Sequence, residues 1–170
     1  AEGDFVAIAQ SGGVAAISTP VDAEIAKLNR ELGVTVVAYG RAEVRDVVGK
    51  KLKLATEAKD EVAADRLSFL SFKSKASVTR SFSAPAAGAY IDGDGDLVAG
   101  LASGKYDYDE IEEEKLSDEL KKMDPEKRTA HLKEQVAKRA ELQKKLDELL
   151  AKRRDFVTAE KARLAKEGKG

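Results

Sequence analysis

Residues 124–167, DPEKRTAHLKEQVAKRAELQKKLDELLAKRRDFVTAEKARLAKE, form the stretch that decides the fold. Asp124 suits the N-cap and Pro125 the first helical position, so this pair predicts the start of a helix. Neither proline nor glycine follows until Gly168. We therefore expect one helix over residues 125–167, about 60 Å long at a rise of about 1.5 Å per residue.

Large apolar residues recur along this stretch at a near-heptad spacing. They are Leu132, Leu142, Leu146, Leu149 and Phe156. The polar residues that interrupt the seam are Gln135, Arg139, Arg153 and Glu160. Because of these interruptions the pattern does not predict a long dimeric coiled coil. We expect the first half of the helix to pack against the rest of the protein and the second half to be exposed or bound to a partner.

The N-terminal region carries the predicted β structure. Residues 5–17 read FVAIAQSGGVAAI, two apolar runs around a glycine turn, which predicts a hairpin with residues 14–18 as its second strand. A further run at residues 34–38 is rich in β-branched side chains and predicts a buried strand.

A helix is predicted between these strands. Thr19 suits its N-cap, Pro20 its first position, and Gly33 its end. The apolar face of this helix consists of Ile25, Leu28 and Leu32.

The middle of the chain alternates helical and loop patterns. Residues 41–75 predict a helix, with residues 67–72 ambiguous between helix and strand, and residues 76–95 have the composition of a loop. Asp96 can cap a short helix through Leu101 that Gly104 ends. Residues 106–122 predict an acidic helix.

These patterns predict a mainly α protein with a small β element at the N-terminus, an α+β arrangement, and a long C-terminal helix. We expect a small α/β core over residues 1–75, a loop and short helix over residues 76–104, and a charged helical extension over residues 105–170.

Composition and charge exclude several classes of protein. Of 170 residues 36% are charged, the net charge is −1 and cysteine is absent. Thiolate chemistry and disulfides are thus excluded, and no global field draws the chain to nucleic acid. No apolar run is long enough to predict a membrane span.

The candidate sites all have simpler explanations. The run from Asp92 to Asp96 alternates oxygen ligands but lacks the glycine and glutamate of a calcium-binding loop, so an acidic turn is the better interpretation. His131 is the sole histidine, and no catalytic partner lies at a suitable spacing from it in the sequence. We expect it to be a surface residue. The Ser11-Gly12-Gly13 turn lacks the lysine of a phosphate-binding loop.

Two clusters of charged residues are further candidates for interaction sites. The acidic cluster is Asp107, Asp109, Glu110, Glu112, Glu113 and Glu114. It is expected to lie along the basic final helix or to engage a basic partner. The basic residues Lys144, Lys145, Lys152, Arg153 and Arg154 alternate with acidic ones and predict a solvated face. No catalytic, cofactor-binding or metal-binding residue is assigned, and no cofactor is expected.

Part of the chain resembles the end of a bacterial von Willebrand factor type A domain with its helical extension. The residues that carry the resemblance are Ile8-Ala9-Gln10, Gly12-Gly13, Thr19-Pro20, Asp22, Ile25, Tyr39-Gly40, Gly95 to Val98, Glu113 to Leu116, Met123 to Lys127 and Arg153 to Phe156. Such domains bind a divalent cation through an Asp-x-Ser-x-Ser loop, a sequence that this chain does not contain. The resemblance implies the C-terminal part of a larger, exported protein, periplasmic or extracellular, with a cytoplasmic location as the alternative.

The expected function is non-enzymatic: a module for protein interaction, structure or assembly. Its partner is expected to be another protein or a second copy, bound through the N-terminal strands or the long helix. The alternative is the tail of a cation-dependent adhesion or sensor protein whose metal site lies upstream. An enzyme with working carboxylates such as Asp92 or Asp109 has the weakest support.

Overall fold

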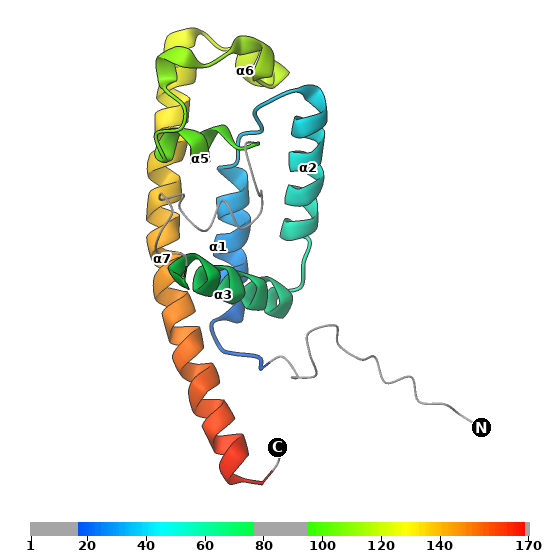
Figure 1. Ribbon diagram of the computed structural model, residues 1–170, viewed down its shortest axis with the longest axis vertical. Coiled ribbons are helices and arrows are strands. Elements are labelled where there is room, and N and C mark those ends of the chain that lie inside the picture. Colours follow the sequence, from blue (N-terminus) through cyan, green and yellow to red (C-terminus); the bar gives the residue numbers. More distant parts are fainter. Residues whose placement is uncertain (1–16, 77–94, 169–170) are drawn as a thin grey trace, which may run out of the picture.

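The computed structural model describes residues 17–76 and 95–168. These residues are mostly helical (Figure 1). The α-helices are α1 (Asp22–Val34), α2 (Ala42–Thr56), α3 (Asp60–Ala76), α5 (Leu97–Ala102), α6 (Asp118–Lys121) and α7 (Pro125–Lys166), and two 3₁₀ turns, η1 (Tyr108–Glu110) and η2 (Glu113–Lys115), precede α6.

Helix α7 is the longest element, and it confirms the prediction made from the Asp-Pro start. It begins at Pro125, directly after Asp124, and its 42 residues end at Lys166. Its sequence is built mainly from Ala, Leu, Glu, Lys and Arg, which are strong helix formers. Helices α1, α3 and α5 lie against it, and α2 lies on the side of α1 away from α7 (Figure 1).

Two clusters of buried apolar side chains hold these helices together. The first joins α1, α2 and α3 to the middle of α7 through Ile25, Leu28, Leu32, Val48, Ala55, Ala64, Leu67, Leu142, Leu146, Leu149 and Leu150. The second joins α5 and the segment around α6 to the start of α7 through Tyr39, Leu97, Val98, Leu101, Leu116, Leu120 and Leu132. The predicted apolar face of α1 is thus confirmed. The division of the chain at residues 75 and 104 stays a prediction.

The predicted β element is not shown. Residues 1–16, with most of the predicted hairpin, lie outside the described residues. Residues 17–76 and 95–168 contain no strand. The predicted strand at residues 34–38 is wrong: Val34 is the last residue of α1 and is 74% exposed. Ala38 makes only an isolated antiparallel bridge with Asp96, because the chain beyond Asp96 turns at once into α5.

Both predicted ends of α1 require correction. The helix begins at Asp22, because the Asp22 carboxylate accepts hydrogen bonds from Thr19 N (2.9 Å) and Thr19 Oγ1 (2.5 Å) and holds Thr19 outside the helix. Gly33 lies inside α1, where a Cβ would come within 3.1 Å of side-chain atoms of Leu52 and Thr56. Gly33 therefore permits the close approach of α2 rather than ending the helix.

The predicted helix at residues 41–75 is two helices, α2 and α3, separated at residues 57–59. Figure 1 shows the chain turning between them so that α3 crosses the N-terminal part of α1. This turn brings Ala64 and Leu67 into the first apolar cluster, where a straight continuation of α2 cannot place them.

The predicted acidic helix at residues 106–122 is also wrong, since only the short elements η1, η2 and α6 form there. Like charges three or four residues apart, such as Asp109 and Glu113, destabilise a continuous helix. By contrast, the predicted helix after Asp96 is confirmed as α5. The Asp96 side chain accepts a hydrogen bond from Val98 N at its start, and Gly104 has a φ of 73° after its end.

Candidate functional site

Arg139 of α7 lies in the interior and joins three segments of the chain. Its Nη1 donates to Asp96 Oδ2 (2.7 Å), its Nε to Thr35 Oγ1 (2.9 Å) and its Nη2 to Thr35 O (2.9 Å). All three residues are buried, with exposed fractions of 4% or less. Since a buried charge is tolerated only when it is paired and hydrogen-bonded, this cluster fixes the position of α7 relative to α1 and α5.

Arg153 forms a second buried cluster fourteen residues further along α7. Its Nε donates to Asp22 Oδ1 (2.8 Å), its Nη1 to Ser68 Oγ (3.2 Å), and its Nη2 to Asp65 Oδ1 and to Ile17 O (3.5 Å). The guanidinium therefore binds the start of α1, helix α3 and the residue at which the described chain begins. It is the last buried residue of α7.

The Asp22 carboxylate is held in its ionised form by this cluster. Burial alone favours the protonated carboxyl and raises the pKa. The hydrogen bonds from Thr19 and the charge of Arg153 outweigh burial, so the pKa of Asp22 lies below its ordinary value of 3.8. The ionised carboxylate thus belongs to the folded state at neutral pH.

A third arginine, Arg128, holds the acidic segment near the start of α7. Its Nη2 donates to Glu113 Oε1 (2.9 Å) and to Met123 O (3.3 Å). The Glu113 side chain is 67% exposed, so this pair lies at the surface and contributes less than the two internal clusters. It supports in part the predicted approach of the acidic cluster to the final helix.

The prediction that Arg153 belongs to a solvated face is therefore wrong. The signal that could have located both internal arginines is their heptad register: Arg139 follows Leu132 by seven residues and Arg153 follows Leu146 by seven. A polar residue on an otherwise apolar seam of a single helix faces the interior. The partners of Arg139 and Arg153 could not be predicted, because Thr35, Asp96 and Asp22 are distant from them in the sequence.

The other candidate residues that the structure describes form no reactive constellation. Asp96 is the one described aspartate of the run at residues 92–96, and its carboxylate binds Arg139 and caps α5. Ser11, Gly12 and Gly13 lie outside the described residues. His131 is half-buried on α7. The described residues contain no group of three or more side chains that could hold a metal ion.

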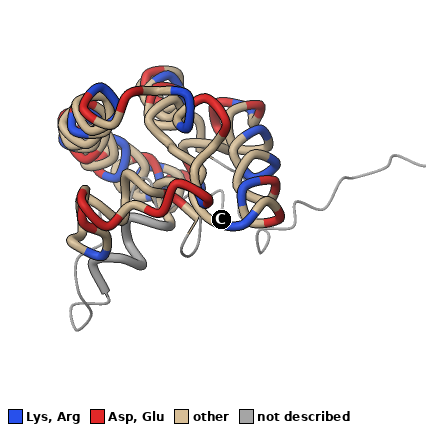
Figure 2. Tube along the Cα trace, turned by 90° about the horizontal axis from the view of Figure 1, so that it is seen from above, with Lys and Arg blue, Asp and Glu red and all other residues tan. Residues whose placement is uncertain are grey.

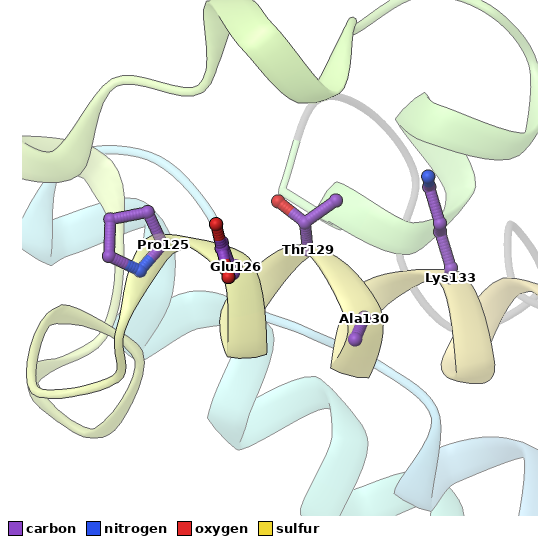
Figure 3. A pocket seen from close by; sticks show the side chains of 5 residues that line it. All are labelled: Pro125, Glu126, Thr129, Ala130 and Lys133. Atoms are coloured by element: carbon purple, nitrogen blue, oxygen red, sulfur yellow. The ribbon is translucent and has the colours of Figure 1, made fainter.

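The surface depressions of the described part include two on or beside α7. The first is an open face of α7 alone: all five residues that line it, Pro125, Glu126, Thr129, Ala130 and Lys133, lie on that helix (Figure 3). The second, about 270 Å³, lies between α3 and α7 and is lined by Ser68, Leu150, Arg153, Arg154, Val157, Thr158 and Lys161. It leads from the last buried residues of α7 onto the remaining length of the helix.

Beyond Arg153 helix α7 continues to Lys166 without a buried residue. Phe156 is 41% exposed, while Val157 and Leu164 are half-buried. Arg163 pairs with Glu160 and Glu167 on the same helix, so these charges are matched locally. Figure 1 shows this C-terminal part of α7 extending beyond the other described helices. We call residues 154–166 the free end of α7.

Comparison with protein-family models, curated proteins and solved structures found no match for this chain. The resemblance to the end of a von Willebrand factor type A domain, and the exported location that it implies, therefore stay predictions. None of the described helices combines the length and the apolar character that crossing a bilayer requires.

Proposed function

We propose that this chain is a non-enzymatic structural module that binds a protein partner through the free end of α7. The helical body fixes the first two thirds of α7 in place, and the remaining part of the same helix is presented to the partner. The body thus serves as a rigid base.

The observation that carries this proposal is the position at which burial stops. Leu146, Leu149, Leu150 and Arg153 are all buried, and the helix then continues for about 20 Å as the free end, at a rise of about 1.5 Å per residue. An isolated helix of this length is marginal in water. The free end draws its helical structure from the anchored part, which reduces the entropy cost when a partner binds.

The chemistry of the free end fits a partner with an apolar stripe. Phe156, Val157 and Leu164 continue the seam that the body covers further up the helix. Leu150 and Val157 also line the depression beside α3, which leads onto this seam. A partner helix with its own apolar face can lie along the seam, as in other complexes in which one helix occupies a groove.

Site-specific photo-crosslinking in the native cell tests this function. A photoreactive amino acid is placed at Val157 or Leu164 on the free end, and at the exposed Lys138 on the anchored part of α7 as a control. We expect a discrete protein adduct from both positions of the free end and none from position 138. Absence of an adduct at positions 157 and 164, or the same adducts at position 138, contradicts the proposal.

A further inference from the structure

Helix α2 exposes an apolar stripe that no described residue covers. Its inner face, with Val48 and Ala55, packs into the first apolar cluster. On its outer side Val44, Val47 and Leu54 are 39%, 49% and 71% exposed. Their spacing of three and seven residues places them along one edge of the helix. Exposed apolar groups in such a row, with charged neighbours, mark an interaction surface.

The second half of α2 is also strongly basic. Lys50, Lys51 and Lys53 are exposed, and no acidic residue lies between Gly49 and Thr56. Lys53 pairs weakly with Glu57 at 3.9 Å. Lys50 and Lys51 form no ion pair within the described residues, so their charges are free for another molecule.

Two exposed carboxylates lie near the other end of the same helix, on α6. Figure 1 shows α6 beside the N-terminal end of α2, and Gly40 N, just before α2, donates to Lys115 O (3.0 Å), just before α6. Asp118 and Glu119 of α6 are exposed and form no ion pair with described residues. Figure 2 looks onto the end of the molecule at which α6 lies and shows several red stretches of the tube there.

We propose that two copies of this chain form a dimer in which their α2 helices pack antiparallel about a two-fold axis. Antiparallel packing places Asp118 and Glu119 of each copy beside Lys50 and Lys51 of the other, which the length of α2 prevents within one copy. Leu54 of one copy then packs against Val44 and Val47 of the other. The surface is therefore complementary to itself in charge and in apolar character.

This arrangement predicts how the dimer responds to its surroundings. Exposed charge pairs are screened by salt beyond a distance of about 10 Å at 0.1 M ionic strength, so the dimer weakens as salt is raised. The apolar contact of Leu54 is not screened, so some association remains at high salt. Because α2 is distant from the free end of α7, this interface leaves the partner-binding part open (Figure 1).

Sedimentation velocity of the full chain over a range of concentrations and at low and high salt tests the dimer. We expect reversible dimerisation. We expect Leu54→Gln to raise its dissociation constant about tenfold or more, since a buried leucine contributes about 1.5–3 kcal/mol. Val62→Gln, which changes an exposed valine of α3 outside the surface, is the matched control and leaves the constant unchanged. A monomer at all concentrations, or equal effects of both substitutions, overturns the proposal.

A charge exchange identifies the two sides of the interface. One variant carries Lys50→Glu and Lys51→Glu, the other Asp118→Lys and Glu119→Lys. Each variant alone places like charges together and is expected to be monomeric, whereas an equal mixture is expected to form heterodimers. Each variant has exposed substitutions only, and circular dichroism checks its fold. Failure of the mixture to associate while both variants are folded overturns the proposed pairing.

Discussion

Arg139 places a guanidinium in the protein interior, where each of its hydrogen bonds is needed. Replacing it with methionine keeps much of the side-chain volume but leaves the Asp96 carboxylate buried without its cation. Loss of one partner of a buried ion pair costs about 3–5 kcal/mol. We therefore expect Arg139→Met to lower the free energy of unfolding by about this amount, measured by urea denaturation.

Two further variants separate this effect from a general loss of charge on α7. Lys138→Met changes the exposed neighbouring residue and should alter the free energy of unfolding by less than about 0.5 kcal/mol. Arg139→Met combined with Asp96→Asn removes the unpaired charge, keeps a side chain able to cap α5, and should recover part of the loss. Equal stabilities of Arg139→Met and Lys138→Met would show that the cluster does not stabilise the fold.

The lowered pKa of Asp22 predicts a dependence of stability on acid. The folded state prefers the ionised carboxylate, so its stabilising contribution is complete above the ordinary pKa of 3.8 and is lost as pH falls through the lower folded value. The stability difference between the natural chain and Asp22→Asn should thus be constant near neutral pH and shrink below pH 3.8. Urea denaturation at several pH values measures it, with Asp155→Asn as the control for loss of an exposed carboxylate. A difference that grows in acid contradicts the prediction.

At the residue scale the sequence predicted some helix starts better than distant partners. The Asp96 side chain caps α5, and α7 begins directly after Asp124 as predicted, although the Asp124 side chain makes no capping hydrogen bond. Arg139 and Arg153 bind residues far away in the chain, and in the sequence they stand out only as interruptions of an apolar seam. Whether a charged residue is buried depends on which distant segments of the chain pack against it. The residues next to it in the sequence do not reveal those segments.

Two glycines in helices give a matched comparison at the scale of elements. A Cβ on Gly100 in α5 would overlap the ring of Tyr106, whereas a Cβ on Gly49 in α2 meets nothing within 4 Å. We expect Gly100→Ala to destabilise the protein by about 1–3 kcal/mol, as overpacking does. Gly49→Ala should stabilise it by about 0.5–1 kcal/mol, since alanine is the better helix former. Thermal denaturation of the two variants checks the opposite signs; two shifts of the same sign contradict the packing described for α5.

Shortened chains test where α7 stops contributing to the fold. A chain that ends after Arg154 keeps all buried residues of α7 and should lose less than about 1 kcal/mol. A chain that ends after Ala140 lacks four buried leucines and Arg153. Each such leucine is worth about 2–5 kcal/mol, which together exceeds the usual total stability of about 5–15 kcal/mol. Circular dichroism should show cooperative unfolding for the first chain and none for the second, and the reverse order would contradict the account.

At the scale of elements, helix starts with strong local sequence signals were predictable, whereas turns that depend on tertiary packing were not. The helix start at Asp124-Pro125 needs no other part of the chain. The turn between α2 and α3 has no proline or glycine, and it lets α3 pack across α1, where Leu67 is buried. The β-branched run at residues 34–38 has a strand-like composition, but among the described residues it has only the segment around Asp96 to pair with.

At the scale of the whole molecule, α7 links the interior to the surface on which the proposed function depends. Its three buried arginines bind the start of α1, the segment before α5 and the segment before α7, and its leucines complete both apolar clusters. The helical body therefore fixes the position of α7, and the side chains of its free end form the surface proposed for the partner. The predicted packing of the first half and exposure of the second agrees with this arrangement, although burial extends to Arg153.

Hydrogen–deuterium exchange along α7 in the isolated protein tests this central claim most directly. Amides in packed helices exchange only when the structure opens, whereas uncovered helical turns exchange much faster. We predict slow exchange from Leu132 to Arg153 and a sharp rise in rate over residues 154–166. Slow exchange that continues to Lys166 in a monomer would show that another part of the chain covers the free end, and would contradict the proposal that it is open to a partner.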